Sequence, residues 1–368
     1  MKIKKYIVLL ITLFLAGCSA PPETPDTIGA MYRGGLQHNG VFEVAAPPAS
    51  GELVWQFETN GEAHASPVYA EGVVYIPSYD KNLYALDAQS GEEIWQAPLP
   101  GITFSSPTIL EDSIYLGTFN GFIALDRATG EEKWHFATER LRLVRSSPVI
   151  YKGAAYFGSD DRNLYAVNIA NGKEIWRFPT KYKIFSSPAV YNNLVFFGTD
   201  GGNIYALNAS NGEEVWSLKA GSRIFASPAV ENDTVYFGNL DGVFYALDAA
   251  SGEVKWELPL KRGIVSSAAV HKGVVYFGSL DKKLYAADIS NGEVLWQFET
   301  NHEVYGSPVI AGHIIYFGSD DMSLYAVSIE TGQEIWHYQT GGFIGSSPFL
   351  IEGLVFFSSY DGSIYAVK

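Results

Sequence analysis

Short apolar runs of about five residues recur from residue 52 to the C-terminus, and Gly, Asn, Asp or Ser residues separate them. One unit contains four strand segments, at residues 186–190, 194–199, 204–208 and 212–216, each with apolar, β-branched or aromatic residues next to turn residues. β-Branched and aromatic runs of this length, bounded by turn-forming residues, predict β-strands joined by tight hairpins. Helical spacing of the apolar positions is absent from this part of the sequence, so we predict an all-β protein.

The tryptophans set the period of these units. Four antiparallel strands repeated about every 40 residues are typical of a β-propeller. From the second Trp onward, a glycine stands four residues before each Trp, where a tight hairpin requires a positive φ. The eight tryptophans share one register, with separations of 40, 39, 42, 40, 40, 40 and 40 residues: Trp55, Trp95, Trp134, Trp176, Trp216, Trp256, Trp296 and Trp336.

The two ends of the repeat predict the number of blades. Residues 346–368 supply three strands and end without a Trp, whereas the segment around Trp55 is a fourth strand with nothing before it. The two pieces complete one blade, which adds to seven whole units. We therefore predict an eight-bladed β-propeller over residues 51–368, with four antiparallel strands per blade and a ring closed by pairing of the N-terminal strand with the C-terminal blade.

Residues 1–17 have the pattern of an export signal. A basic start, Met1–Lys5, precedes an apolar stretch over residues 6–15 that is too short for a permanent membrane helix. The following Ala16-Gly17-Cys18 resembles the lipobox of bacterial lipoproteins, and this resemblance implies acylation of Cys18. An ordinary signal peptide with a chance cysteine is the alternative. By the same resemblance, Ser19 after the cysteine indicates the outer membrane.

The rest of the chain is acidic. The formal net charge is −15, and removal of residues 1–17 with their three lysines makes it −18. This charge repels nucleic acid and anionic lipid headgroups, which excludes both as general partners. Residues 18–50 contain the lipidated cysteine and a lead-in rich in Pro, Ala and Gly, which we predict to be a flexible tether.

One face of the predicted propeller contains a positively charged half, although the chain as a whole is negatively charged. Strand direction alternates within a blade, so all loops between blades emerge on one face. Four consecutive loops hold eight basic residues and one acidic residue, Glu139, whereas the other four hold two glutamates and no basic residue. Apolar residues lie among the basic residues, and this mixture predicts a protein interface. They are Leu141, Leu143, Tyr182, Phe185 and Phe225. Ordinary variation in surface charge is the alternative. The eight residues form what we name the basic arc: Arg140, Arg142, Arg145, Lys181, Lys183, Arg223, Lys261 and Arg262.

The repeat also carries a family resemblance. Leu83-Tyr-Ala-Leu-Asp87, followed by Ser90-Gly91 and Trp95, resembles the repeat of pyrroloquinoline-quinone-type propellers. Quinoprotein dehydrogenases share this repeat with the BamB family of outer-membrane assembly lipoproteins, so the repeat specifies the fold more strongly than the function. In these families the repeat Trp docks on the neighbouring blade, and the resemblance implies this role for all eight tryptophans.

The longest loop between blades resembles a loop of the BamB family. That family binds the barrel-assembly machinery through a Leu-x-Leu-Arg run shortly before a Ser-x-Pro step. The segment Leu141-Arg-Leu-Val-Arg145-Ser-Ser-Pro148 is similar, with one residue added before the Arg. The resemblance implies that Leu141, Leu143 and Arg145 contact such a partner, with Arg142 as a substitute.

Catalytic signatures are absent from the sequence. Many quinoprotein dehydrogenases carry an adjacent cysteine pair over the quinone and a calcium ion held by carboxylate and amide side chains, but this chain has a single cysteine. The sequence also lacks a phosphate-binding glycine-rich loop, a Gly-x-Ser-x-Gly nucleophile motif and a pair of histidines at the spacing of metal ligands. We therefore expect no catalytic residue, no metal and no cofactor. Aspartates between the second and third strands of most units either hydrogen-bond their own turns or form a carboxylate ring around the channel.

These observations predict a non-enzymatic periplasmic scaffold, anchored to the outer membrane through Cys18. It would bind a β-barrel assembly partner or client through its basic face. The alternatives are a small quinoprotein or carbohydrate-processing enzyme that uses the central funnel, and a generic protein- or ligand-binding propeller.

Overall fold

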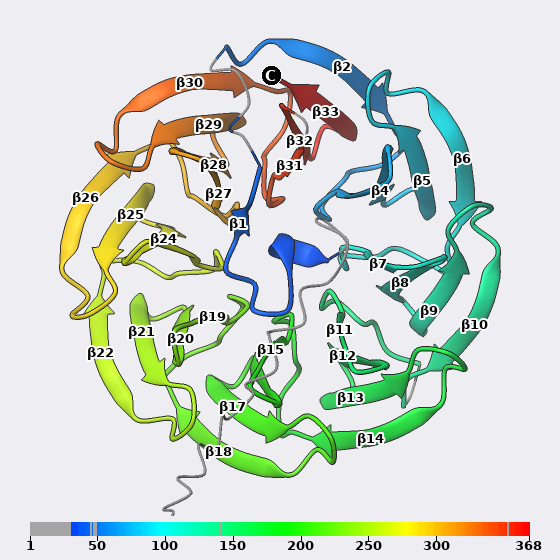
Figure 1. The fold of residues 1–368 in the computed structure, drawn as a ribbon, viewed down its shortest axis with the longest axis horizontal. Helices are drawn as coiled ribbons and strands as arrows, with labels where there is room; N and C mark the ends of the chain where they lie inside the picture. The colour runs from blue at the N-terminus through cyan, green and yellow to red at the C-terminus, as the bar shows by residue number, and fades with distance from the viewer. Residues whose placement is uncertain (1–30, 45, 47–49, 140, 352) are drawn as a thin grey trace, which may run out of the picture.

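The computed structural model describes residues 31–44, 46, 50–139, 141–351 and 353–368. Within these residues the strands form eight sheets arranged radially around a central axis (Figure 1). Seven sheets have four antiparallel strands, and the eighth carries a fifth strand at its inner edge. The predicted all-β, eight-bladed propeller is confirmed.

The four strands of each blade lie side by side from the central axis to the rim, one for each strand predicted in a unit. The innermost strands are β3 (Val68–Ala70), β7 (Thr108–Leu110), β11 (Val149–Tyr151), β15 (Ala189–Tyr191), β19 (Ala229–Glu231), β23 (Ala269–His271), β27 (Val309–Ala311) and β31 (Phe349–Ile351). The second strands are β4 (Val73–Pro77), β8 (Ser113–Thr118), β12 (Ala154–Gly158), β16 (Leu194–Gly198), β20 (Thr234–Gly238), β24 (Val274–Ser279), β28 (Ile314–Gly318) and β32 (Leu354–Ser358).

The two outer positions of each blade hold six-residue strands, apart from the five-residue β33. The third strands are β5 (Asn82–Asp87), β9 (Gly121–Asp126), β13 (Asn163–Asn168), β17 (Asn203–Asn208), β21 (Val243–Asp248), β25 (Lys283–Asp288), β29 (Ser323–Ser328) and β33 (Ser363–Val367). The outermost strands are β6 (Glu93–Pro98), β10 (Glu132–Ala137), β14 (Glu174–Pro179), β18 (Glu214–Lys219), β22 (Val254–Pro259), β26 (Val294–Glu299), β30 (Glu334–Gln339) and β2 (Leu53–Glu58).

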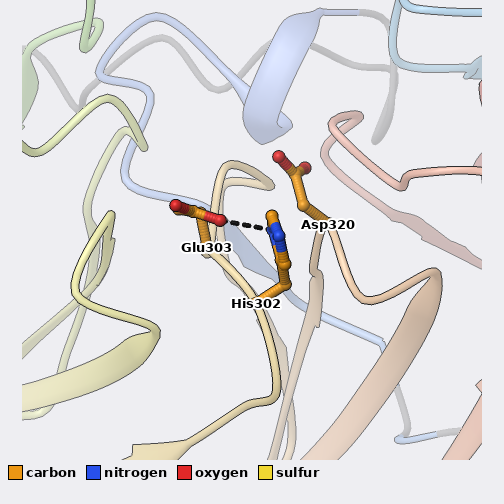
Figure 2. Close-up of side chains that lie close together, drawn as sticks. All are labelled: His302, Glu303 and Asp320. Carbon is orange, nitrogen blue, oxygen red and sulfur yellow. Dashed lines mark ion pairs between the residues drawn. The ribbon is translucent and has the colours of Figure 1, made fainter.

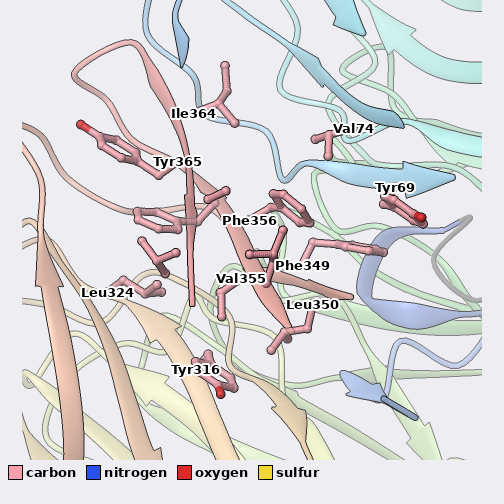
Figure 3. Packing of buried hydrophobic residues seen from close by; sticks show 14 of the residues in the cluster. Tyr69, Val74, Tyr316, Leu324, Phe349, Leu350, Val355, Phe356, Ile364 and Tyr365 are labelled. Atoms are coloured by element: carbon pink, nitrogen blue, oxygen red, sulfur yellow. The ribbon is translucent and has the colours of Figure 1, made fainter. Parts of the chain in front are cut away.

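The composite blade closes the ring as predicted. Strand β2 pairs antiparallel with β33, so the N-terminal strand completes the C-terminal blade. Its core contains Phe349, Leu350, Val355 and Phe356, and Tyr69 of the first blade belongs to the same cluster (Figure 3). The two ends of the repeat are therefore joined both by a strand ladder and by a shared apolar core.

The tryptophans dock on the neighbouring blade, as the resemblance implied. The indole Nε1 of Trp55 donates a hydrogen bond to the carbonyl oxygen of Ala88 in the next blade, 2.9 Å away. Equivalent bonds of 2.8–3.1 Å are made by Trp134, Trp176, Trp216, Trp256 and Trp296. Each bond satisfies a polar group at the edge of a large apolar ring.

The glycine before each Trp has two roles in this docking. Gly91 has a φ of +72°, as its hairpin position predicted, and an added Cβ would lie 2.6 Å from Cδ2 of Trp55. Gly51 stands in the same way against Trp336 of the preceding blade. The glycine therefore permits the left-handed turn and also leaves room for the indole of the previous blade.

The lead-in, residues 31–44, lies across the centre of the ring (Figure 1). It contains a short 3-10 helix, η1 (Tyr32–Gly34), and strand β1 (Val41–Phe42), which pairs in parallel with β27. The backbone amides of four consecutive innermost strands donate to lead-in carbonyl oxygens over 2.7–2.9 Å: Val190 to Leu36, Val230 to Gln37, Val270 to Asn39 and Ile310 to Gly40.

The prediction of a flexible tether over residues 18–50 is therefore wrong for residues 31–44. Composition gave no sign of this packing, because it depends on backbone carbonyl groups and on single side chains, such as buried Phe42 against Phe349, that form no periodic pattern. Cys18 and the export signal lie outside the described residues. Among the residues that the structure describes, no helix is both long and apolar enough to cross a membrane.

Candidate functional site

A ring of serine side chains surrounds the central axis at the start of the innermost strands. The backbone amide of one serine donates to the hydroxyl oxygen of the serine in the adjacent blade, as from Ser106 to Ser147 over 2.9 Å. Among the described residues, seven such bonds of 2.8–2.9 Å are present. The Ser-Pro step of the repeat therefore links the blades near the axis. The serine ring consists of Ser66, Ser106, Ser147, Ser187, Ser227, Ser267, Ser307 and Ser347.

Above the serine ring lies a cavity of about 740 Å³, which we name the funnel. Its wall includes the residue two positions before each ring serine, so one position of the repeat supplies a side chain from every blade. Leu240 and Leu280 of two turns add to the wall, and Tyr32 of the lead-in also lines the cavity. The repeated wall residues are His64, Phe104, Arg145, Phe185, Phe225, Val265, Tyr305 and Gly345.

Aromatic contacts hold one side of the funnel wall together. The ring of His64 stacks on Tyr79 and on Tyr360, with centroid distances of 4.2 and 3.7 Å. Burial lowers the pKa of His64, although its hydrogen bond to Glu62 acts in the opposite direction. Burial thus favours the neutral form of His64, and the wall at this point is an aromatic stack.

Arg145 is the cation of the funnel wall. Its guanidinium carbon lies 4.4 Å from the ring centroid of Phe104 and 5.3 Å from that of Phe185. Its Nε is 3.2 Å from Oδ1 of Asp160, whose other oxygen accepts from Nζ of Lys183 over 3.0 Å. Arg145 and Lys183 thus share one carboxylate, which fixes both side chains.

A second cavity of about 300 Å³ adjoins this cluster, and we name it the cationic cleft. Arg142, Arg162 and Lys183 line it together with Asp160 and Asp161. Three cations therefore face two carboxylates. The cleft lies on the half of the loop face that the basic arc predicted to be positive.

The structure separates the two leucines predicted as partner contacts. Leu141 is 59% exposed and has a left-handed φ of +48°. Leu143 is only 7% exposed. Leu143 is therefore buried within the chain itself, whereas Leu141 is accessible to a partner, and the predicted partner contact of Leu143 stays a prediction.

The basic arc does not form one uniform surface. Arg223 pairs with Asp200, with 3.2 Å between Nε and Oδ1. Lys181 lies over the ring of Tyr182, which is 39% exposed. Lys261 and Arg262 are exposed, and Arg140 lies outside the described residues.

Most turn aspartates act locally. The hydroxyl of Tyr84 donates to Asp80 over 2.6 Å, and the amide of Asn82 donates to the same carboxylate over 3.0 Å. These bonds favour the turn role over a ring of free carboxylates. A tyrosine four residues later donates in the same way to Asp161, Asp281, Asp321 and Asp361.

One cluster on the loop face was not visible in the sequence. Figure 2 shows His302, Glu303 and Asp320 close together, with their ligand-type atoms within 4.8 Å of one another. Burial, followed by the charges of Glu303 and Asp321, raises the pKa of Asp320 to about 6, while His302 acts against this. Sequence reasoning missed the cluster because a loop before β27 and a turn after β28 supply its members, 17 residues apart.

Two family profiles match the chain. The family described as "Beta-alanine-activating enzyme, beta-propeller" matches residues 110–313, and the family described as "Outer membrane protein assembly factor BamB" matches residues 299–368. No curated protein sequence matches significantly.

Several solved structures share the fold. BamB from Moraxella catarrhalis is 19% identical, with a TM-score of 0.75 over 86% of this chain and 99% of that one. Quinohemoprotein alcohol dehydrogenase from Comamonas testosteroni is 14% identical, with a TM-score of 0.81 over 93% of this chain and 80% of that one. A europium-containing methanol dehydrogenase is 15% identical, with a TM-score of 0.77 over 92% and 91%. The predicted resemblance to quinoprotein-like propellers and to BamB is confirmed at the level of the fold.

Proposed function

Because the chain belongs to the β-propeller family described for the β-alanine-activating enzyme, and its last blades match the profile of BamB, we propose that it is a non-enzymatic scaffold that binds a protein partner through its loop face. The partner is a component or client of the barrel-assembly machinery. The protein is held at the periplasmic side of the outer membrane by acylated Cys18.

The observation that carries this proposal is the exposed apolar surface beside the basic arc. Leu141 is 59% exposed, Tyr182 39% and Phe119 50%, and all three lie in loops or turns of the same face. Large apolar side chains exposed among charged residues are typical of protein interfaces. The cations around them would steer an acidic partner toward this face of an otherwise acidic molecule.

The funnel does not fit the quinone and calcium that its dehydrogenase relatives imply. Serine hydroxyls, aromatic and aliphatic side chains, His64 and Arg145 line the cavity, and its described lining contains no carboxylate or amide side chain to ligate calcium. The single cysteine cannot form an adjacent pair. The donor set therefore supports a binding role over quinone chemistry, and no reaction step follows from it.

In-cell photo-cross-linking tests the scaffold proposal. A cross-linker at Lys181, on the loop face, is compared with one at Lys173, in the turn between β13 and β14 on the opposite face. We expect one protein to be captured from Lys181 only. Leu141→Ser should reduce this capture about tenfold, as expected for a residue that the partner buries on binding.

The matched control for the cross-linking is Asn60→Lys, at an exposed position of the loop face away from the basic arc. This variant should capture the partner as well as the wild type does. Equal capture from Lys181 and Lys173, or capture that is insensitive to Leu141→Ser, would show that the loop face is not the interface.

A further inference from the structure

The funnel and the cationic cleft meet at one carboxylate. Asp160 lines the cleft, and it pairs through Oδ1 with Arg145 of the funnel wall and through Oδ2 with Lys183 of the cleft. The side chain of Asp160 is 9% exposed, so its surroundings hold it in place and both ion pairs with it. The two cavities therefore border the same ion-paired cluster, the funnel on its apolar side and the cationic cleft on its charged side.

The apolar funnel suits a bulky side chain. The funnel wall presents Phe104, Phe185 and Phe225, with the last two rings stacked 5.3 Å apart. A cavity of about 740 Å³ lined in this way is within the size range of pockets that bury whole ligand groups. An apolar side chain that inserts between these rings removes its apolar surface from water, which favours its insertion.

The base of the funnel supplies hydrogen-bond donors for a backbone. Each bonded ring serine accepts an amide hydrogen bond at its hydroxyl oxygen, as Ser147 does from Ser106. Among the described residues, no acceptor is found for the hydroxyl hydrogens of this ring. These hydrogens can donate to the carbonyl groups of a segment that enters the funnel.

The cationic cleft has cations without counter-ions. Asp161 already accepts from the hydroxyl of Tyr165 and the amide of Asn163, and Asp160 is shared by two cations. Within the described chain, Arg142 and Arg162 make no ion pair. In a protein of net charge −15, two unpaired guanidinium groups in one cleft are a local site for carboxylates.

We propose that the funnel and the cationic cleft together bind an extended acidic segment of the partner protein, which inserts an apolar or aromatic side chain into the funnel and places carboxylates against Arg142 and Arg162. Leu141 precedes Arg142 and is exposed beside the cleft, so it adds an apolar contact for the chain outside the funnel. This inference rests on the proposed scaffold function and identifies the chemistry that the scaffold recognises.

Fluorescence anisotropy with labelled hexapeptides tests the inference on the full lipidated chain in detergent. The probes contain two adjacent glutamates and one phenylalanine, with one, two or three residues between them. Binding by at least one spacing is expected. Phe→Ala in that peptide, or replacement of both glutamates by glutamine, should weaken binding at least tenfold.

Matched protein variants locate the binding. Arg142→Glu with Arg162→Glu should weaken binding of the glutamate peptide at least tenfold and leave the glutamine peptide unchanged. Lys173→Glu with Lys272→Glu makes the same change in charge at exposed turns on the opposite face, outside both cavities, and should have less than a twofold effect. Val265→Trp, which narrows the funnel, should weaken binding of the peptide that contains phenylalanine. Binding of the peptide in which alanine replaces it should not change.

Several outcomes would overturn the inference. Equal effects of the two charge-reversal pairs would mean that binding is only general electrostatic attraction. Full displacement of the peptide by inorganic phosphate or phenylacetate alone at equal concentration would mean a small-anion site. Preferred binding of a chitin trisaccharide, insensitive to the charge variants, would mean a carbohydrate site.

If no peptide binds while the capture from Lys181 remains sensitive to Leu141→Ser, this inference fails and the scaffold function stands. If the peptide binds as expected but no partner is captured, the scaffold function fails instead.

Discussion

The backbone amide of Ser347 donates a hydrogen bond to the hydroxyl of Ser66 over 2.8 Å, although the two residues are 281 positions apart in the chain. This bond continues the series of amide-to-hydroxyl bonds between adjacent blades and crosses the boundary between the last blade and the first. The inner edge of the propeller is therefore closed by the same contact that, among the described residues, joins six of the other seven pairs of adjacent blades. The outer edge is closed separately, by the pairing of β2 with β33.

Ser66→Ala should lower the free energy of unfolding by about 1–3 kcal/mol, because it leaves the amide of a buried serine without an acceptor. Ser347 is 4% exposed, so water cannot easily replace the lost bond. Chemical denaturation measures the change. Ser290→Ala, at an exposed position in the turn between β25 and β26, is the control and should cost less than half as much. Similar losses for both variants would contradict a structural role for the serine ring.

Gly91→Ala should destabilise the protein more than Gly72→Ala does. Both glycines have a positive φ, +72° and +86°, so both substitutions strain the backbone. At Gly91 the new Cβ would also lie 2.6 Å from Trp55, whereas at Gly72 nothing lies within 4 Å. Thermal unfolding should show an additional loss of about 1–3 kcal/mol for Gly91→Ala, the usual cost of overpacking. Equal melting temperatures would refute the second role of this glycine.

The lead-in should loosen as the pH falls. Burial, followed by the charge of Arg33, lowers the pKa of His38 to about 3. The released lead-in binds this proton more tightly than the packed one, so the stability from neutral His38 is complete above pH 6.5 and is lost as the pH falls toward 3. The expected loss is about 1.4 kcal/mol per pH unit within this window.

Hydrogen exchange at residues 31–44 between pH 7 and pH 4.5 measures this loosening. His38→Asn is the matched variant, because Asn tolerates the φ of +51° at this position and does not titrate. Its lead-in should show a much weaker dependence on pH. A wild-type lead-in that stays fully protected at pH 4.5 would mean that His38 finds a partner for its proton.

Cys18→Ser should release the protein from membranes and leave its melting temperature unchanged. The substitution removes the only cysteine, and therefore the proposed acylation site, from a chain whose net charge is negative. Membrane fractionation measures the release. If the variant remains in the membrane fraction, either the export segment is retained or the partner holds the protein there.

The sequence alone determined the fold because every unit of the repeat contains the same succession of strand segments, turn residues and Trp. The register of the eight tryptophans predicted the blades, and the missing Trp after Tyr365 predicted the composite blade and its closure by the segment around Trp55. Strand length, turn chemistry and period all depend on neighbours within about 40 residues, so local pattern is enough to specify them.

The site was decided by tertiary structure. Leu141 and Leu143 look equivalent in the sequence, yet one is 59% exposed and the other 7%. Arg145 was predicted only as a member of the basic arc and a partner contact. The turn between β12 and β13 places Asp160 against its guanidinium group, and Arg145 lies in the funnel wall. The lead-in has no periodic pattern, and it fills the centre of the ring because its carbonyl groups meet unpaired amides of four innermost strands. Sequence period fixes which residues repeat, whereas closure of the ring fixes which of them meet across its axis.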